Sequence, residues 1–258
     1  MRMSRRLASG VGGYEFYDYI GNNMLSVVDG TQPNIETPVS HKKVKFYGQF
    51  YLDRGLMPDD NDEASLVCRE LERDSSFSSS QSGSILVKFG LCRYNFELEF
   101  PNSSGGTSLE GRFFPGSGGL SNDWHILSLS TTCNLSGIAS FKYNVSFDNT
   151  SYFNEATGYG AGRLEQLGSA KWSLFSYPPL IGSANKFPSG WAPDSRAFCG
   201  KIKLMQIKDL ATNTVVARLK PCKRKCDGMI GMYDTVSNQF CPARNGSGNP
   251  TSFYVGNV

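Results

Sequence analysis

The chain has 258 residues and a formal net charge of +3. That charge is too small to indicate a nucleic-acid-binding protein, because such proteins carry strongly basic surfaces. No stretch is long and apolar enough to span a bilayer as a helix, so we expect no membrane insertion. Abundant glycine (28 residues) and 12% aromatic residues favour a chain of short strands joined by many turns.

Residues 1–13, MRMSRRLASGVGG, form a basic, glycine-containing arm. A secretory signal peptide needs an apolar core after its positive region, and none follows here. We therefore expect a protein that is made in the cytoplasm and not exported. The arm is either a loose terminus or a segment that docks on a neighbouring subunit.

Strands are expected along most of the remaining chain, in the order 14–20, 44–52, 65–72, 84–91, 94–100, 124–132 and 138–148. The segment 65–72 could also be a helix, although we favour a strand, and the last two strands are expected to pair as a hairpin or meander. Residues 101–111 and 151–162 are expected to be loops because they are rich in glycine and polar residues. Residues 164–172 form the best candidate for a short helix. With no internal repeat and no clear linker, the economical division is the arm and one domain over 14–258.

Residues 200–208 alternate with the period of a strand and are expected to place Ile202 and Leu204 on one face and Lys201 and Lys203 on the other. A turn over 209–214 leads to further short strands near 215–221, 227–234, 238–240 and 252–256. Strands at such short, regular intervals indicate an antiparallel sandwich or barrel.

Three passages carry a resemblance to a known family. They are Asp123-Trp124-His125 opening a strand, PLIGSANKFPSGWAPDSRAFCGKIKLMQIKD, and the closing VVARLKPCKRKCDGMIGMYDTVSNQFCPARNGSG. Together they resemble the laminin-G-like branch of the concanavalin A-like superfamily, as found in proteins of gut bacteria and their phages. The closing signature is carried by Arg218, Pro221, Asp227, Gly228, Gly231, Tyr233, Asp234, Phe240, Asn245, Gly246, Gly248 and Phe253. The resemblance is weaker before residue 120, where MLSVVDGTQPN replaces the usual run after the opening strand.

The resemblance implies an all-β fold, an antiparallel two-sheet jelly-roll sandwich. The signature residues are expected to serve the fold: Gly228 and Gly231 at turns, and Tyr233 over a sheet edge. Trp124 is expected in the core, because large aromatic side chains dominate sheet packing. His125 has no predicted acid partner or nucleophile, so we treat it as structural.

Enzymes of this superfamily hydrolyse sugars with two carboxylates on one strand. Glu97 and Glu99 have the required spacing, because residues two apart share a strand face. They lack the third acid of the run that the resembling enzymes carry. We therefore predict a protein that is not an enzyme, with Glu97 and Glu99 on a solvent face.

Metal sites are considered at two places. Asp59, Asp60 and Asp62 offer oxygen ligands suited to Ca²⁺, although a hydrated loop is the interpretation we favour. Cys222, Cys226 and Cys241 have zinc-like spacing but lack a fourth ligand nearby. We expect the seven cysteines to be reduced thiols, and no cofactor other than Ca²⁺ is considered.

Aromatic residues in turn-rich segments are the candidates for binding glycan or protein. They are Tyr152, Tyr159, Trp172, Tyr177 and Trp191. Trp191 is the sharpest candidate, and it is either a lid on the core or a ligand contact.

Our hypothesis is a phage virion protein for host attachment or capsid decoration, whose jelly roll binds glycan or another virion protein. Its arm would bind other virion proteins, and we expect copies of the chain to assemble. The alternatives are a carbohydrate-binding module of a bacterial cell surface and a glycoside hydrolase.

Overall fold

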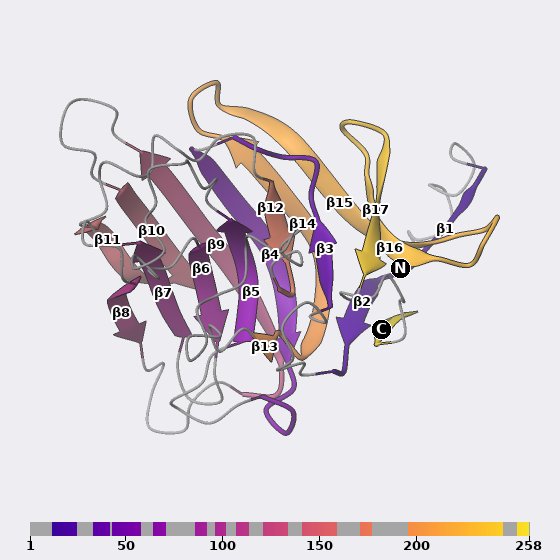
Figure 1. Cartoon of the computed structure of the whole chain (residues 1–258), viewed down its shortest axis with the longest axis horizontal. Helices are drawn as coiled ribbons and strands as arrows, with labels where there is room; N and C mark the ends of the chain where they lie inside the picture. The colour runs from indigo at the N-terminus through magenta and orange to yellow at the C-terminus, as the bar shows by residue number, and fades with distance from the viewer. Residues whose placement is uncertain are drawn as a thin grey trace, which may run out of the picture.

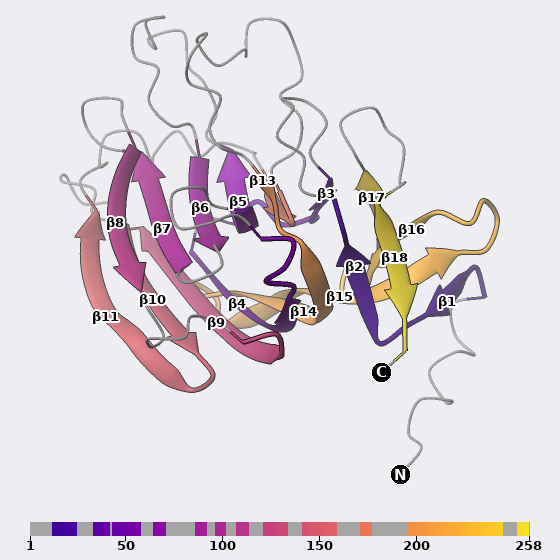
Figure 2. The same ribbon diagram turned by 90° about the horizontal axis from the view of Figure 1, so that it is seen from below.

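The protein is described from a computed structural model, which covers residues 12–24, 33–41, 43–57, 64–70, 86–91, 96–101, 107–113, 121–133, 141–158, 171–176, 196–244 and 252–257. All regular secondary structure in these residues is β-strand (Figure 1), so the all-β fold class is confirmed. Within the same residues, none forms a helix of the length and hydropathy needed to cross a membrane. The strands divide into two sheets that face one another (Figure 2).

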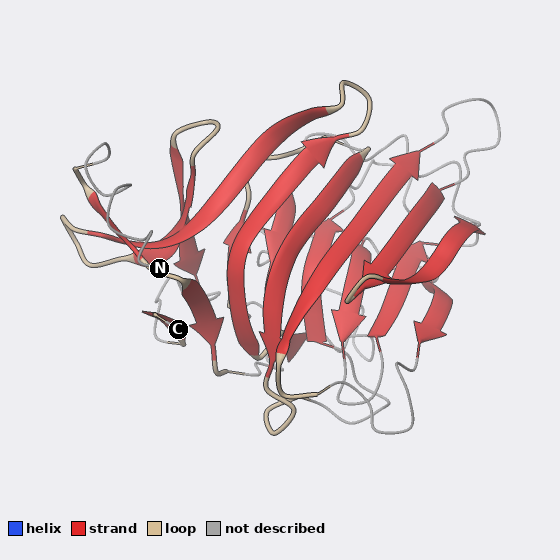
Figure 3. Ribbon diagram, turned by 180° about the vertical axis from the view of Figure 1, so that it is seen from behind, coloured by secondary structure: helices blue, strands red, loops and turns tan. Residues whose placement is uncertain are grey.

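The larger sheet, called sheet A, is antiparallel throughout, and Figure 3 shows its outer face. Its main run of neighbours is β11–β10–β9–β4–β14–β2–β18. Along the second half of β14, β15 takes the place of β2 as the neighbour. β15 also pairs with β1 and β16, and β16 pairs with β17. The bounds are β1 (Tyr14–Phe16), β2 (Tyr19–Asn22), β4 (Val44–Leu52), β9 (Trp124–Cys133), β10 (Phe141–Phe147), β11 (Thr150–Gly158), β14 (Gly200–Asp209), β15 (Thr214–Arg224), β16 (Ile230–Asp234), β17 (Gln239–Arg244) and β18 (Phe253–Gly256).

The smaller sheet, called sheet B, has the order β3–β12–β5–β6–β7–β8, and the end of β17 pairs with β3. The short strand β13 pairs in parallel with the start of β5. The bounds are β3 (Asn34–Glu36), β5 (Ala64–Glu70), β6 (Leu86–Leu91), β7 (Phe96–Pro101), β8 (Thr107–Phe113), β12 (Trp172–Leu174) and β13 (Arg196–Ala197).

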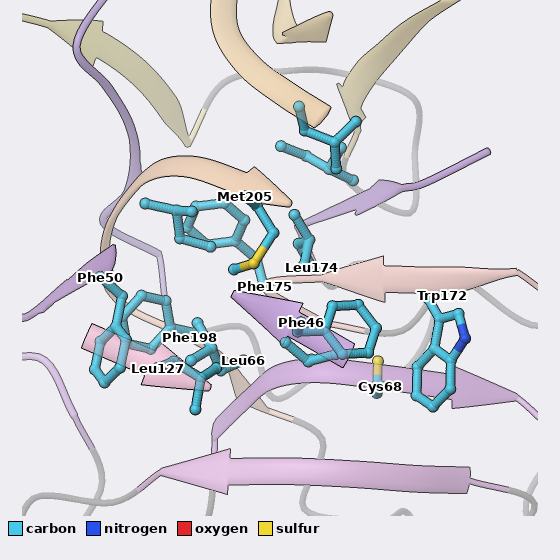
Figure 4. Close-up of a cluster of buried hydrophobic side chains, with 14 of the residues drawn as sticks. Phe46, Phe50, Leu66, Cys68, Leu127, Trp172, Leu174, Phe175, Phe198 and Met205 are labelled. Carbon is cyan, nitrogen blue, oxygen red and sulfur yellow. The ribbon is translucent and has the colours of Figure 1, made fainter. Parts of the chain in front are cut away.

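The core lies between the sheets and is rich in aromatic side chains (Figure 4). Phe46 of sheet A meets Trp172 of sheet B edge to face, with ring centroids 5.0 Å apart. Phe198 similarly lies between Phe50 and Phe175, 5.8 Å from each. These rings are fully buried, and such aromatic pairs add to the hydrophobic energy of burial.

Two turns near the C-terminus share one local design. Asp209 ends β14 and accepts hydrogen bonds from the backbone N–H of Ala211 (3.1 Å) and of Thr212 (3.2 Å). Asp234 ends β16 and accepts in the same way from Val236 and Ser237, at 3.1 and 3.0 Å. An aspartate that binds the backbone two and three residues ahead stabilises a tight turn.

Each of these turns closes on an asparagine in the left-handed region, Asn213 (φ 59°) or Asn238 (φ 57°). Asparagine adopts this conformation more readily than most residues. The segments DLATNT and DTVSNQ are therefore two copies of one turn, which the sequence analysis did not identify.

Most predicted strands are confirmed, including β4, β5, β6, β7 and β9, and β10 is the hairpin partner of β9 as expected. Two predicted loops are wrong. Residues 107–113 form β8 because they pair with β7. Residues 150–158 form β11 because they pair with β10 across a hairpin. The predicted strand 14–20 is interrupted at Tyr17 and Asp18 and becomes β1 and β2. Of the candidate helix over 164–172, only Lys171 and Trp172 are described, and Trp172 belongs to β12.

Candidate binding surface

A row of aromatic and basic side chains crosses the outer face of sheet A. In the register of the sheet, Trp124 of β9 lies opposite Tyr51 of β4, and Tyr51 lies opposite Lys201 of β14. Lys201 in turn lies opposite Gly21 of β2, which lies opposite Tyr254 of β18. Directly opposed residues in an antiparallel sheet share a face, and their chain neighbours point into the core. The row is therefore a consequence of the register of five strands.

Tyr19 of β2, two residues before Gly21 and on the same face, joins Trp124 to Tyr254, and Tyr51 contacts Trp124 directly. The Tyr19 ring centroid lies 6.1 Å from Trp124 and 6.2 Å from Tyr254, and Tyr51 lies 5.8 Å from Trp124. The Tyr254 ring also covers Gly21, since a Cβ added there would lie 2.3 Å from it. Burial raises the pKa of the Tyr254 hydroxyl, with nearby Tyr19 and Asp53 adding to the effect. These contacts hold the four rings at fixed positions on the sheet.

Two lysines lie among these rings. The Lys201 ammonium is 4.7 Å from the Tyr51 ring centroid and 4.9 Å from that of Tyr19. The Lys203 ammonium lies 4.0 Å from the Trp124 ring centroid. Cation–π contacts of this kind contribute about 0.5–1 kcal/mol at exposed sites. We call Tyr19, Tyr51, Trp124, Tyr254, Lys201 and Lys203 the aromatic–lysine surface.

A β-bulge in β14 sets the position of Lys203. Ile202 pairs with Phe50 of β4 and Met205 pairs with Gly48, so two residues of β14 face one residue of β4. Both residues of the bulge point outward, and Leu204 is 42% exposed. The prediction that Ile202 and Leu204 share a face is therefore wrong. The extra residue reverses the alternation after Lys203, and Met205 takes the core position instead.

The bulge borders a pocket of about 410 Å³. Its wall is formed by Tyr47 and Gln49 of β4, Lys203 and Leu204 of β14, and Lys220 of β15; Phe16, Tyr17, Asp18, Gly48 and Pro221 complete it. The pocket opens where the neighbour of β14 changes from β2 to β15. The segment between β1 and β2 closes one side, anchored by a hydrogen bond from the Tyr17 N–H to the Pro221 carbonyl (3.0 Å). Lys203 belongs both to this pocket and to the aromatic–lysine surface.

Beneath Trp124, His125 points into the core and meets an acid. Its Nδ1 lies 2.7 Å from Asp148 Oδ2, and its Nε2 lies 3.0 Å from the Ser121 carbonyl oxygen. Asp148 Oδ1 also accepts from the Ile126 N–H at 2.7 Å, so the aspartate joins the β10–β11 turn to β9. The sequence analysis predicted no acid partner for His125, and that prediction is wrong. Both ring nitrogens are engaged, so His125 and Asp148 tie Ser121 and the β10–β11 turn to β9.

Asp148 reaches His125 because of its backbone conformation. Asp148 and Asn149 both have positive φ (47° and 64°), as expected of a two-residue hairpin turn between β10 and β11. The turn brings residue 148 back beside Ile126, 22 positions earlier in the chain. The dipeptide Asp148-Asn149 is a recognisable turn signal in the sequence. The contact between Asp148 and His125, however, follows only from the register of β9 with β10.

Two predictions about tryptophans are wrong. Trp172 was a candidate ligand contact, but it is 1% exposed, packs on Phe46 and donates from Nε1 to the His41 carbonyl (2.9 Å). Trp124 was expected in the core, but it lies half-buried on the outer face under Lys203. All three residues of β12 are buried, so Trp172 does not reach the surface. The alternation of β9 places His125 inward and Trp124 outward.

Several predicted site residues are not tested. Tyr159, Tyr177 and Trp191, and the calcium candidates Asp59, Asp60 and Asp62, lie outside the described residues. Tyr152 lies in β11, where the register with β10 shifts, rather than in a loop, and its side chain is outside the description. Glu97 and Glu99 lie in β7 as expected, again without a described side chain.

Five cysteines have described side chains, and none of the five forms a disulfide. Cys199, Cys222 and Cys241 are buried, and burial raises the pKa of each of these thiols to about 12. Cys226 is exposed, which separates it from the other two members of the zinc candidate. Within the described part of the chain, no three His, Cys, Asp or Glu side chains gather as they would around a metal ion.

The comparisons with known proteins identify no family. No family model matches the chain, and no curated protein matches it. Among solved structures, one similar chain is a carbohydrate esterase from the Shiga toxin-encoding bacteriophage phi24B. It is 11% identical, with a TM-score of 0.35 over 77% of this chain and 95% of that chain. A TM-score this low supports no conclusion about the function of this chain.

Proposed function

We propose that this protein is a bacteriophage virion component that binds glycan through the aromatic–lysine surface. The observation that carries the proposal is the convergence of Tyr19, Tyr51, Trp124 and Tyr254 on one face of sheet A. Tyrosine and tryptophan present an apolar ring together with a polar group. A pyranose ring has the matching chemistry, with C–H groups on its faces and hydroxyls at its edge. Binding sites commonly join an apolar lining to a few polar groups in this way.

The assignment to a virion rests on the closing signature and on the basic arm of residues 1–13. Both fit a laminin-G-like jelly roll of the gut-phage type, which we propose for this chain. A glycan-binding module of a bacterial cell surface would use the same aromatic–lysine surface, so location separates the two. Labelling of purified phage particles for this chain, viewed by negative-stain electron microscopy, tests that point directly. Particles without label would favour the cell-surface alternative.

Glycan binding is tested by applying the full chain to a glycan array. The variants Trp124→Ala and Tyr51→Ala each remove one ring from the outer face. We expect each to lower the affinity for the bound glycans about tenfold, since a well-packed aromatic contact at a binding site contributes about 1–3 kcal/mol. Val236→Ala serves as the control because Val236 is exposed (46%) in the turn between β16 and β17.

The outcomes separate binding from fold maintenance. Equal melting temperatures for the variants and the parent chain show that a loss of binding is not a loss of structure. If the parent chain binds no glycan, or if Trp124→Ala and Tyr51→Ala bind as the parent does, the proposal is wrong. A virion protein without glycan binding would then be assigned a structural role.

The arm is tested by deletion. The Lys225 N–H donates to the Gly13 carbonyl (2.8 Å), so residue 13 belongs to the folded domain and a clean deletion removes residues 1–11 only. We expect this shortened chain to keep its melting temperature and to be absent from purified particles. Normal incorporation would exclude an anchoring role for the arm.

A further inference from the structure

The pocket beside the β14 bulge is positioned to receive part of a ligand that lies on the aromatic–lysine surface. Its volume of about 410 Å³ lies near the lower end of the range of about 300–1,000 Å³ that is typical of small-molecule sites. Its wall includes the side chains of Tyr47 and Leu204, which are 50% and 42% exposed. The pocket therefore combines an apolar wall with open access from the outer face of sheet A.

The charges in and beside the pocket are mainly positive. Lys203 and Lys220 line it from two different strands, and Lys201 lies between the rings of Tyr19 and Tyr51 next to it. Among the residues that the structure describes, no carboxylate forms an ion pair with any of these three lysines.

One acidic side chain, Asp18, also lines the pocket, and Asp53 lies near Tyr254 at the end of the row. Asp18 offsets part of this charge, and the side chains that line the pocket keep a formal net charge of +1, from Lys203 and Lys220 (+2) and Asp18 (−1). An ammonium held beside apolar rings is partly shielded from water, which strengthens its attraction for an anion.

We propose that the pocket binds the carboxylate-bearing residue of an acidic glycan, with Lys203 and Lys220 as the groups that recognise the carboxylate. This inference rests on the proposed function, because the neighbouring sugars of the same glycan would lie on the aromatic–lysine surface. Lys203 connects the two parts, since it contacts Trp124 and lines the pocket. A lysine ammonium donates charge-assisted hydrogen bonds to carboxylate oxygens, and these are stronger than bonds between neutral groups. The ligand class is therefore a polysaccharide that contains uronic or other carboxylated sugars.

The test measures the affinity of the full chain for tetragalacturonic acid and for its fully methyl-esterified form by calorimetry. The two probes share their sugar rings, and only the first carries charge. We expect the parent chain to bind the acid about tenfold more tightly than the ester at low salt, since each charged hydrogen bond contributes on the order of one factor of ten. The difference should shrink in 0.5 M NaCl, where the screening length falls to a few ångström, about 3–5 Å.

Single variants assign the effect to the pocket. Lys220→Met should lower the affinity for the acid about tenfold and leave the affinity for the ester unchanged, whereas Lys203→Met should lower the affinity for the acid more than the affinity for the ester, because Lys203 also contacts Trp124. Lys203→Arg should restore most of the loss. Lys208→Met is the matched control, because Lys208 lies on the same strand and the same face but does not line the pocket.

The results distinguish the inference from the proposed function. If the acid binds no more tightly than the ester, or if the methionine variants weaken both probes equally, the carboxylate site is overturned while glycan binding stands. If Trp124→Ala leaves both affinities unchanged, the aromatic–lysine surface is not the binding site and the proposed function fails. A loss confined to the acid in Lys220→Met, and larger for the acid than for the ester in Lys203→Met, with the melting temperature unchanged, supports the site.

Discussion

The turns at residues 209–214 and 234–239 are built from neighbours in the sequence, whereas the aromatic–lysine surface joins side chains from five separate strands. In each turn, one aspartate binds backbone groups two and three positions ahead. In the surface, Tyr19, Trp124 and Tyr254 meet although more than 100 residues separate each from the next. Local structure of the first kind can form early and independently, but the second kind exists only when the register of the whole sheet is correct. Three substitutions test this contrast.

The largest effect is expected for Asp234→Ala. Asp234 is fully buried and also accepts from the Arg218 N–H (2.7 Å), which joins its turn to β15. Its loss removes the acceptor of the Arg218, Val236 and Ser237 N–H groups and should lower the free energy of unfolding by about 3 kcal/mol, measured by urea denaturation. Asp209→Ala removes the equivalent turn without a bond of that kind to β15, so a smaller loss is expected. An equal or greater loss for Asp209→Ala would show that the Arg218 bond adds nothing.

A smaller loss of stability, with a loss of binding, is expected for Gly48→Ala. A Cβ at Gly48 would lie 2.8 Å from Met205 Sδ and 3.0 Å from the Leu204 carbonyl oxygen, so the Met205 side chain must move and the backbone of the bulge must give by a few tenths of an ångström. We expect about 2 kcal/mol lower stability from overpacking, and weaker glycan binding because Lys203 moves with the bulge.

Gly55→Ala is the control for this change, since its Cβ would lie at an ordinary 3.4 Å from Asp53 Oδ1. Calorimetric titration with the glycans found on the array measures binding in both variants. Unchanged binding by Gly48→Ala would show that the bulge does not position the site.

The smallest effect is expected for Asp227→Asn, in the hairpin between β15 and β16. The hydrogen bond from Arg224 and the backbone bond from Met229 lower the pKa of the Asp227 carboxyl to about 2. Because this value is below that of about 3.9 in the unfolded chain, the stabilising contribution is present above pH 4 and disappears as the pH falls toward 2. The pair is exposed to solvent, so the contribution is small.

Melting temperatures of the parent chain and Asp227→Asn at pH 7 and pH 2 measure this contribution. The variant should melt slightly lower at pH 7, and the difference should shrink at pH 2, where about half of the Asp227 carboxyls are protonated. A difference of the same size at both pH values would mean that the substitution acts through packing rather than through the charge.

Much of the strand pattern could be predicted because it depends on side-chain alternation and turn residues. The strands β4, β9 and β10 follow from period-two patterns. Strands β8 and β11 were missed because their own composition is turn-like, and pairing with β7 and β10 overrides that preference. The bulge was missed for a related reason: a strict two-residue period cannot show where one extra residue reverses it, as at Leu204.

The candidate site was less predictable than the fold. The search for ligand contacts among turn-rich segments selected Trp172, which the structure buries, and passed over Tyr51, which lies within a strand. Trp124, also in a strand, was assigned to the core because of its size. Strand residues on an outer face have the same alternation whether that face binds a ligand or only meets water. One signal was present: outward positions of β4 and β9 carry aromatic residues where polar ones are more usual.

The sequence by itself determined that the chain is all-β, where most strands lie, and that residues 209–214 form a turn, because these depend on side-chain alternation and on turn residues close together in the chain. Only the tertiary structure decided that Tyr19, Tyr51, Trp124 and Tyr254 share one face, that His125 meets Asp148, and that Lys203 joins the rings to a pocket. The physical reason is register. The pairing of strands far apart in the sequence selects which outward side chains become neighbours, and that choice is made by the burial of the opposite face.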